Sequence, residues 1–206
     1  LTDERKSGWL PPTVNLDSKS GLEVAVPWYW NIAPQRDATL TPIAYTRRGF
    51  GALGEARYLE ARHGGEAQWH WLPKDRVFGA SRSALQWKQQ GLAFGGSAAS
   101  AWRWRHEGLR VSDDAYWKDF SNALRSFTPR LLPMSAGAEH DWRLAGMDTT
   151  TYARVQYWQV LQDADPLALI TAPYHRAPQI GWRGLGRPWS SGPELSFEAE
   201  ANRFRL

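Results

Sequence analysis

The 206-residue sequence contains no cysteine, which excludes disulfide bonds, thiol catalysis and cysteine-ligated metal sites within the chain. It has no apolar run of about 18 residues or more, so no transmembrane helix is expected. Its lysines and arginines are scattered and leave a formal net charge of only +4, which argues against nucleic-acid binding. No initiator methionine or signal-peptide pattern opens the chain, and an alternating run stops at residue 206; we therefore expect an internal fragment of a longer protein.

The sequence also lacks the signatures of an enzyme or a metalloprotein. There is no GxSxG motif, and the adjacency of His140 and Asp141 says nothing about a catalytic pair. His70 has no second histidine at ligand spacing, so no metal is expected there. The aspartates at 113, 114 and 119 do not fit the EF-hand spacing and are read as a loop built on Asx turns. We expect no catalytic residues, no metal and no cofactor. The alternative is an outer-membrane barrel enzyme such as a phospholipase, whose Ser and His would lie on barrel strands, but no motif in the sequence indicates it.

Tryptophan is abundant, with 13 residues in the chain. Trp is favoured where part of the ring is apolar and part is wet, as in protein interfaces and at the headgroup level of membranes. The mean hydropathy of −0.55 does not decide between these settings. The strands of a membrane barrel alternate apolar and polar residues, so their average is polar as well.

The dominant periodicity is two, which predicts strands. From 22 to 30 the even positions are apolar: Leu22, Val24, Val26, Trp28 and Trp30. The same alternation occurs at 66–71, 85–88 and 102–105, and less cleanly at 150–162, 177–184 and 193–206. Turns are expected at 47–51 and 62–66, and longer polar connections at 112–130 and 163–176. We predict nine or ten strands.

Two all-β architectures fit this pattern. A soluble antiparallel sandwich buries one face of each sheet, usually with Val, Ile and Leu. Here the apolar positions hold mainly Trp, Tyr, Ala and Leu, and charged residues stand opposite them, including Glu55, Arg57, Arg103 and Arg105. A polar lumen and a lipid-facing aromatic belt explain this better, so an antiparallel up-and-down meander in a transmembrane barrel wall is favoured. The alternative is a soluble, Trp-rich β-sandwich that binds carbohydrate.

Two prolines occur within the first two expected strands, at Pro27 and Pro42. Proline has no N–H to donate to a sheet ladder. Each proline should therefore remove one ladder hydrogen bond, a net loss of about 1 kcal/mol. In the alternative interpretation, each proline lies at an outward or edge position where it costs little.

Several segments carry a resemblance to a known family. The segment PWYWNIAPQRDATLTP at 27–42 is followed by YTRRG at 45–49 and GEARYL at 54–59. The others are SGWLPP at 7–12, VSDDAYWKDF at 111–120, ARVQYWQVLQD at 153–163 and PYHRAPQI at 173–180. In this order they resemble the LptD family, lipopolysaccharide-assembly proteins also known as OstA or organic solvent tolerance protein.

The resemblance implies about the first third of a transmembrane β-barrel of roughly 26 strands in the Gram-negative outer membrane. Residues 1–20 would be the junction from a periplasmic jellyroll, and residues 21–206 the first nine or ten strands of an incomplete barrel. The implied function is lipopolysaccharide transport and insertion into the outer leaflet. The implied partners are lipopolysaccharide, the LptE lipoprotein plug, the periplasmic LptA bridge through the missing jellyroll, the barrel assembly machinery and outer-membrane lipid.

The resemblance also assigns candidate site residues. Pro27 and Pro42 match the family positions held responsible for loosening the first strands, and so mark a lateral gate beside a seam with the last strand. Trp28, Tyr29, Trp30 and Asn31 would contact the passing lipid near this gate, or would be ordinary belt anchors.

Overall fold

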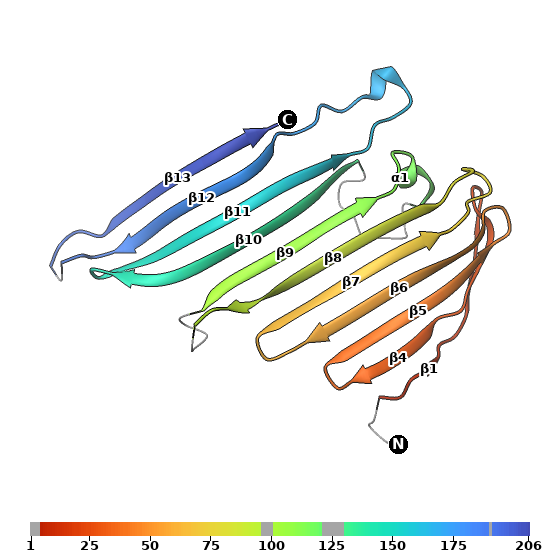
Figure 1. Cartoon of the computed structure of the whole chain (residues 1–206), viewed down its shortest axis with the longest axis horizontal. Helices are drawn as coiled ribbons and strands as arrows, with labels where there is room; N and C mark the ends of the chain where they lie inside the picture. The colour runs from red at the N-terminus through yellow and green to blue at the C-terminus, as the bar shows by residue number, and fades with distance from the viewer. Residues whose placement is uncertain (1–4, 96–100, 121–129, 190) are drawn as a thin grey trace.

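The computed structural model describes residues 5–95, 101–120, 130–189 and 191–206, and these form one antiparallel sheet of thirteen strands (Figure 1). The strands are β1 (Gly8–Trp9), β2 (Thr13–Asp17), β3 (Gly21–Ala25), β4 (Trp28–Ala33), β5 (Arg36–Tyr45), β6 (Gly49–Leu59), β7 (His63–Leu72), β8 (Arg82–Ala93), β9 (Trp102–Val111), β10 (Leu131–Leu144), β11 (Met147–Val160), β12 (His175–Gly186) and β13 (Leu195–Arg205). Two short helices lie in connections: α1 (Tyr116–Asp119) and the 3-10 turn η2 (Pro166–Ala168). The predicted all-β, antiparallel meander is confirmed.

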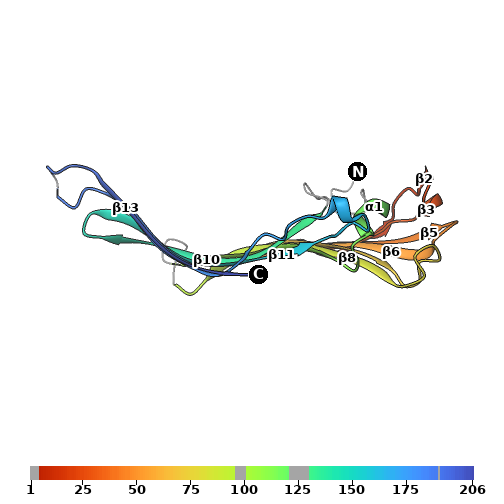
Figure 2. The same ribbon diagram turned by 90° about the horizontal axis from the view of Figure 1, so that it is seen from above.

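From β4 to β13 each strand pairs with the next one in the chain. The sheet is a single curved layer that does not close on itself (Figure 2). No second sheet packs against it within the described residues, whereas a sandwich requires one. The open meander is therefore consistent with part of a barrel. In the part of the chain that the structure describes, no helix is long and apolar enough to cross a membrane.

The first strand of the meander is broken into two halves. β3 and β4 both pair with β5 in one continuous register, with Ala25 opposite Ile43 and Trp28 opposite Leu40. The break falls at residues 26–27, where Pro27 stands. The outer side of β3 is covered by β2 in a hairpin, and the outer side of β4 by the two residues of β1.

The two faces of the sheet differ in chemistry, as the alternation predicts. Residues opposite each other in neighbouring strands share a face. The apolar face exposes large side chains strand after strand: Trp30, Leu40, Phe50, Trp71, Leu85 and Trp182. The other face carries ion pairs between neighbouring strands, including Arg57 with Asp37 at 2.8 Å and Arg103 with Glu139 at 3.2 Å.

The buried core lies at one end of the polar face, under α1; we call this the α1 end. It is formed by inward residues from the strand ends together with the helix. Its members include Ile43, Tyr45, Leu72, Ala84, Leu109, Val111, Tyr116 and Phe120. The opposite end, where β4 turns into β5, carries no comparable covering among the described residues (Figure 1).

The structure differs from the sequence predictions at the β6–β7 turn and at β10. The turn expected at 62–66 lies earlier, because β6 ends at Leu59 and β7 already begins at His63. Gly64 and Gly65, read as turn residues, instead lie in the strand where neighbouring side chains approach closely; a Cβ on Gly65 would come within 2.8 Å of the Gln89 side chain. The strand β10 was not predicted. The connection expected at 112–130 contains α1, and residues 121–129 lie outside the described residues.

Candidate functional site: the first strand pair and its anchorage

Pro42 interrupts the ladder between the first two strands. The Val26 N–H donates to the Pro42 carbonyl oxygen at 3.1 Å. In an antiparallel ladder the same two residues normally exchange a second bond in return. Pro42 has no N–H and cannot make it. Since β5 is flanked on both sides by other strands, this proline does not occupy an edge position.

Pro27 faces the other way, toward the outer edge of the sheet. Its carbonyl oxygen accepts a bond at 2.8 Å from the N–H of Leu10, next to β1. The reciprocal bond to Leu10 is missing because Pro27 has no N–H. The two prolines are thus nearly opposite each other, at 26–27 and 41–42, and remove donors on the two different sides of the first strand. The expected loss of one ladder bond at each fits this geometry.

The four residues after Pro27 alternate between the faces. Trp28 and Trp30 are on the apolar face, with ring centroids 6.0 Å apart, and Trp30 is half exposed. Tyr29 and Asn31 are on the polar face, opposite Thr39 and Asp37. The Tyr29 hydroxyl donates to Asp37 at 3.3 Å. The structure thus brings the aromatic and polar candidates to one half-strand but on different faces.

The β2–β3 hairpin is tied down at the α1 end. In its turn, the Asp17 carboxylate accepts the N–H groups of Lys19 and Ser20 at 3.1 and 2.9 Å. The Leu22 N–H donates to the Thr46 hydroxyl at 3.0 Å. Arg47 donates to the carbonyl of Ser18, and the Lys19 ammonium donates to the carbonyl of Lys118 in α1. We call β3 the inner half of the first strand and β4 its outer half. The inner half is therefore attached to its neighbours by side chains as well as by its ladder hydrogen bonds.

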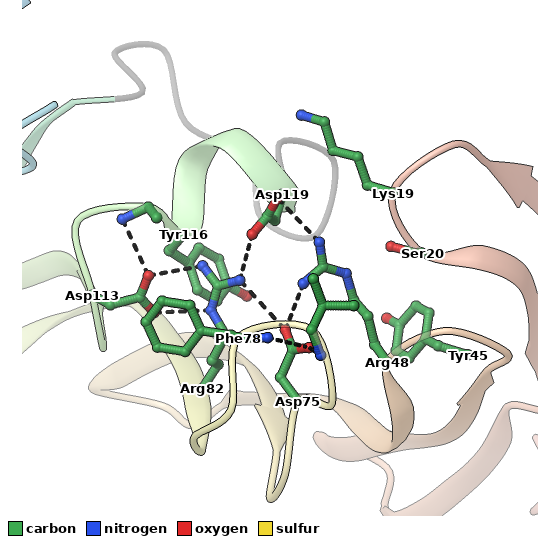
Figure 3. A network of polar contacts seen from close by, with 12 residues as sticks. Lys19, Ser20, Tyr45, Arg48, Asp75, Phe78, Arg82, Asp113, Tyr116 and Asp119 are labelled. Atoms are coloured by element: carbon green, nitrogen blue, oxygen red, sulfur yellow. Dashed lines mark hydrogen bonds and ion pairs between the residues drawn. The ribbon is translucent and has the colours of Figure 1, made fainter. Parts of the chain in front are cut away.

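A buried ion cluster holds this same end together (Figure 3). It consists of Arg48 in the β5–β6 turn, Asp75 in the β7–β8 loop, Arg82 at the start of β8, and Asp113 and Asp119 around α1. Arg48 contacts Asp75 at 2.6 Å and Asp119 at 3.1 Å. Arg82 contacts Asp119 at 2.6 Å, Asp75 at 3.4 Å, and both Asp113 oxygens at 2.8 and 3.0 Å.

Aromatic rings enclose the cluster. The Arg82 guanidinium lies 4.4 Å from the Phe78 ring centroid and 5.0 Å from that of Phe120. The Arg48 guanidinium lies 5.1 Å from the same Phe120 ring. The rings remove water from around the charges, which strengthens their mutual attraction and makes an unpaired charge costly. Removing any one of the five charged groups should therefore weaken the contacts of the others.

The protonation of the cluster follows from its contacts. Burial alone would raise the pKa of Asp75, but hydrogen bonds from the N–H groups of Val77 and Phe78 and from Arg48 outweigh it. The pKa of Asp75 consequently lies below its ordinary value, and the carboxylate is charged at neutral pH. Burial raises the pKa of Tyr116, so its hydroxyl stays neutral. This hydroxyl makes a hydrogen bond with the buried His70 side chain.

Sequence reasoning missed Arg48, Asp75 and Arg82. Arg48 is 27 positions from Asp75, and Arg82 is 31 and 37 positions from Asp113 and Asp119, so no local spacing indicates these contacts. The Asx turn expected in the 111–120 segment is present, since Asp113 accepts the Ala115 N–H at 3.1 Å. Asp113 and Asp119 serve as partners of arginines. Within the described residues no group of three or more His, Asp or Glu is arranged to hold a metal ion.

The polar face also forms an open hollow of about 850 Å³ at mid-sheet. Charges of both signs line it, including Arg62, Arg103, Arg105, Glu107, Glu139 and Arg154. Arg103 and Arg154 both contact Glu139, at 3.2 and 3.5 Å. The predicted charged side of the strands is thus a continuous, partly ion-paired surface.

Comparison with known proteins identifies the family. The model of the family described as LptD, LPS transport system D, matches residues 82–205. Proteins named LPS-assembly protein LptD from Paracidovorax citrulli, Acidovorax sp. and Albidiferax ferrireducens are 41%, 43% and 40% identical to this chain. The alignments cover 100%, 99% and 100% of the chain but 24%, 25% and 25% of those proteins, so the chain spans about a quarter of the length of these curated relatives. The chain belongs to the LptD family.

Proposed function

We propose that this chain is the first part of a barrel that transports lipopolysaccharide into the outer leaflet of the Gram-negative outer membrane. The support is the family membership together with the alternation of one aromatic, exposed face and one charged face in a single open sheet. A lipid-facing belt and a polar lumen require these two faces. The sandwich alternative gains no support, because the described residues supply no second sheet.

Lateral opening at the first strand is the finer part of the proposal. The observation that carries it is the contrast between the two halves of that strand. The inner half, β3, is held by β2 and β5 and by the contacts of Thr46 and Arg47 with the β2–β3 hairpin. Among the described residues, the outer half, β4, has only β5 and the two-residue β1 as strand neighbours. Pro27 and Pro42 lie at the boundary, where the ladder has lost donors on both sides.

Such an arrangement is a hinge. Bending a sheet at a given level requires breaking or stretching ladder bonds there, each worth a net contribution of about 1 kcal/mol. At the level of the prolines one bond of each residue pair is already absent, because Pro27 and Pro42 have no N–H to donate. The outer half can therefore move outward while the inner half stays in place. Trp28 and Trp30 move with the outer half on its lipid side, and Tyr29 and Asn31 on its lumen side.

The remaining assignments follow the family resemblance. We place the junction from the periplasmic jellyroll at residues 1–20 and the barrel at residues 21–206, with the α1 end toward the periplasm. The proposed partners are lipopolysaccharide, the LptE plug against the charged face, the LptA bridge through the jellyroll, the barrel assembly machinery and membrane lipid. We assign transport and not catalysis to the chain.

The test is a proline replacement in the full-length protein. Pro27→Ala with Pro42→Ala should restore two donors, stiffen the first strand and lower the rate of lipopolysaccharide export, measured by the appearance of newly made lipopolysaccharide at the cell surface. Pro133→Ala is the matched control, because Pro133 lies in β10, far from the first strand. Unchanged export in the double variant, or an equal loss in the control, would contradict a hinge at Pro27 and Pro42.

A further inference from the structure

The outer edge of the first strand is already occupied by the chain itself. Residues 5–17 run antiparallel along it, with β2 on the inner half and residues 5–10, including β1, on the outer half. The register changes between the two parts. Thr13 pairs with Ala25 in one register, whereas Trp9 pairs with Trp28 in a register shifted by one residue. The segment therefore binds in two separate pieces, joined by Pro11 and Pro12.

The two pieces are held very differently. β2 and β3 form a hairpin of five residue pairs with a short turn whose N–H groups are capped by Asp17. This piece is local in sequence, so little loop-closure entropy opposes it. Gly21, at φ +76° after the turn, adopts a backbone conformation that glycine reaches without strain.

Residues 5–10 are bound by fewer and more exposed contacts. The Leu10 N–H donates to Pro27 at 2.8 Å, without the reciprocal bond that Pro27 cannot give. Asn31 supplies two further bonds: its N–H donates to the Ser7 hydroxyl at 2.9 Å, and its side-chain amide donates to the Arg5 carbonyl at 2.7 Å. Arg5 also lies 3.8 Å from Asp37, with its side chain largely exposed. Two of these four contacts depend on the side chains of Asn31 and Ser7.

These contacts use the backbone groups that a strand closing the barrel would need. Tyr29 and Asn31 direct their N–H groups outward, on the side of Pro27 and away from β5. A backbone N–H or C=O at an edge accommodates one neighbouring strand at a time. Residues 5–10 and a closing strand therefore compete for the outer half of the first strand.

We propose that residues 5–10 are a displaceable latch strand that occupies the outer half of the first strand and exchanges with the strand that closes the barrel, while β2 remains in place. The partner of this edge is an extended segment recognised through main-chain hydrogen bonds. Asn31 is the residue that anchors the latch, since it binds both Ser7 and Arg5. The inference rests on the proposed function for the closing strand and for its physiological readout.

Engineered disulfides test the exchange in the full-length protein. Trp9 and Trp28 are directly opposite each other at a non-hydrogen-bonded position, where Cα atoms are about 4.5 Å apart and a disulfide fits. Trp9→Cys with Trp28→Cys should crosslink on mild oxidation, and lipopolysaccharide export should fall several-fold in the oxidised state and recover with reductant. Val14→Cys with Val24→Cys is the matched control in the β2–β3 hairpin. Its disulfide should form with no difference in export between the two redox states.

Each other outcome overturns the latch. If the hairpin pair crosslinks but the Trp9–Trp28 pair does not, residues 5–10 do not occupy the edge. If both pairs crosslink without affecting export, or if both block it equally, the two pieces do not differ in mobility. Crosslink yield does not depend on transport, so it shows where residues 5–10 lie even if the full-length protein exports no lipopolysaccharide. An absence of export would contradict the proposed function and not the position of residues 5–10.

A second variant tests the anchor. Ser7→Ala removes the acceptor of the Asn31 N–H and leaves the first strand unaltered. The Asn31 amide should then exchange its hydrogen several-fold faster, and the yield of the Trp9–Trp28 disulfide should fall. Unchanged exchange at Asn31 would refute its role as the anchor.

Discussion

Replacing Asp75 with asparagine removes the central negative charge of the ion cluster and keeps the shape of the side chain. Asp75 is fully buried and accepts bonds from Arg48 at 2.6 Å and from the Val77 and Phe78 N–H groups at 2.9 and 3.2 Å. The asparagine oxygen can still accept one set of these bonds, so the change is mainly electrostatic. It leaves Arg48 and Arg82, both buried, with less compensating charge.

The magnitude follows from the cost of breaking a buried ion pair, about 3–5 kcal/mol. We expect about 3 kcal/mol for Asp75→Asn, the lower end, because Asp119 still contacts both guanidinium groups. The assay is urea unfolding of the full-length protein in detergent. Asp148→Asn is the matched control: it breaks an exposed ion pair with Arg143 and should cost less than about 1 kcal/mol. Equal losses in the two variants would refute the claim that the buried cluster holds the α1 end.

Three further predictions concern the same sheet. The pKa of Asp75 is lower in the folded protein than in the unfolded chain. Its contribution to stability is therefore present above pH about 4 and is lost as the pH falls through the folded-state pKa. Asp75→Asn should remove this contribution to the acid-side dependence of the free energy of unfolding. Gly54→Ala should destabilise the fold by about 1–3 kcal/mol, since its Cβ would lie 1.8 Å from the Trp69 ring. Gly8→Ala, whose Cβ would meet no described atom within 4 Å, should be neutral in the same unfolding assay. Pro42→Ala alone should create an amide that bonds the Val26 carbonyl and is protected from hydrogen exchange; a freely exchanging amide would place this ladder position elsewhere.

The alternation at 22–30 predicted the strand and its faces because one buried or lipid-facing side imposes period two on the residues themselves. The same reasoning predicted the charged face that holds Arg57 and Arg103. It failed at Gly64 and Gly65, since glycine in a turn and glycine under a close neighbour look alike in sequence.

The anchorage of the site was beyond sequence reasoning. Arg48, Asp75 and Arg82 come together only when the turns at one end of the meander gather under α1. Likewise, the placement of residues 5–10 depends on a register that shifts by one residue at Pro11 and Pro12. Sequence indicated the two prolines in the first two strands, but not which half of the first strand has the additional contacts.

We propose that the first strand is firm on the β3 side of Pro27 and loose on the β4 side. Amide hydrogen exchange of the full-length protein in lipid nanodiscs measures this directly. Residues 28–33 should exchange faster than residues 21–25, and the Pro27→Ala, Pro42→Ala double variant should reduce the difference. Equal protection of the two halves in the unaltered protein would contradict the hinge.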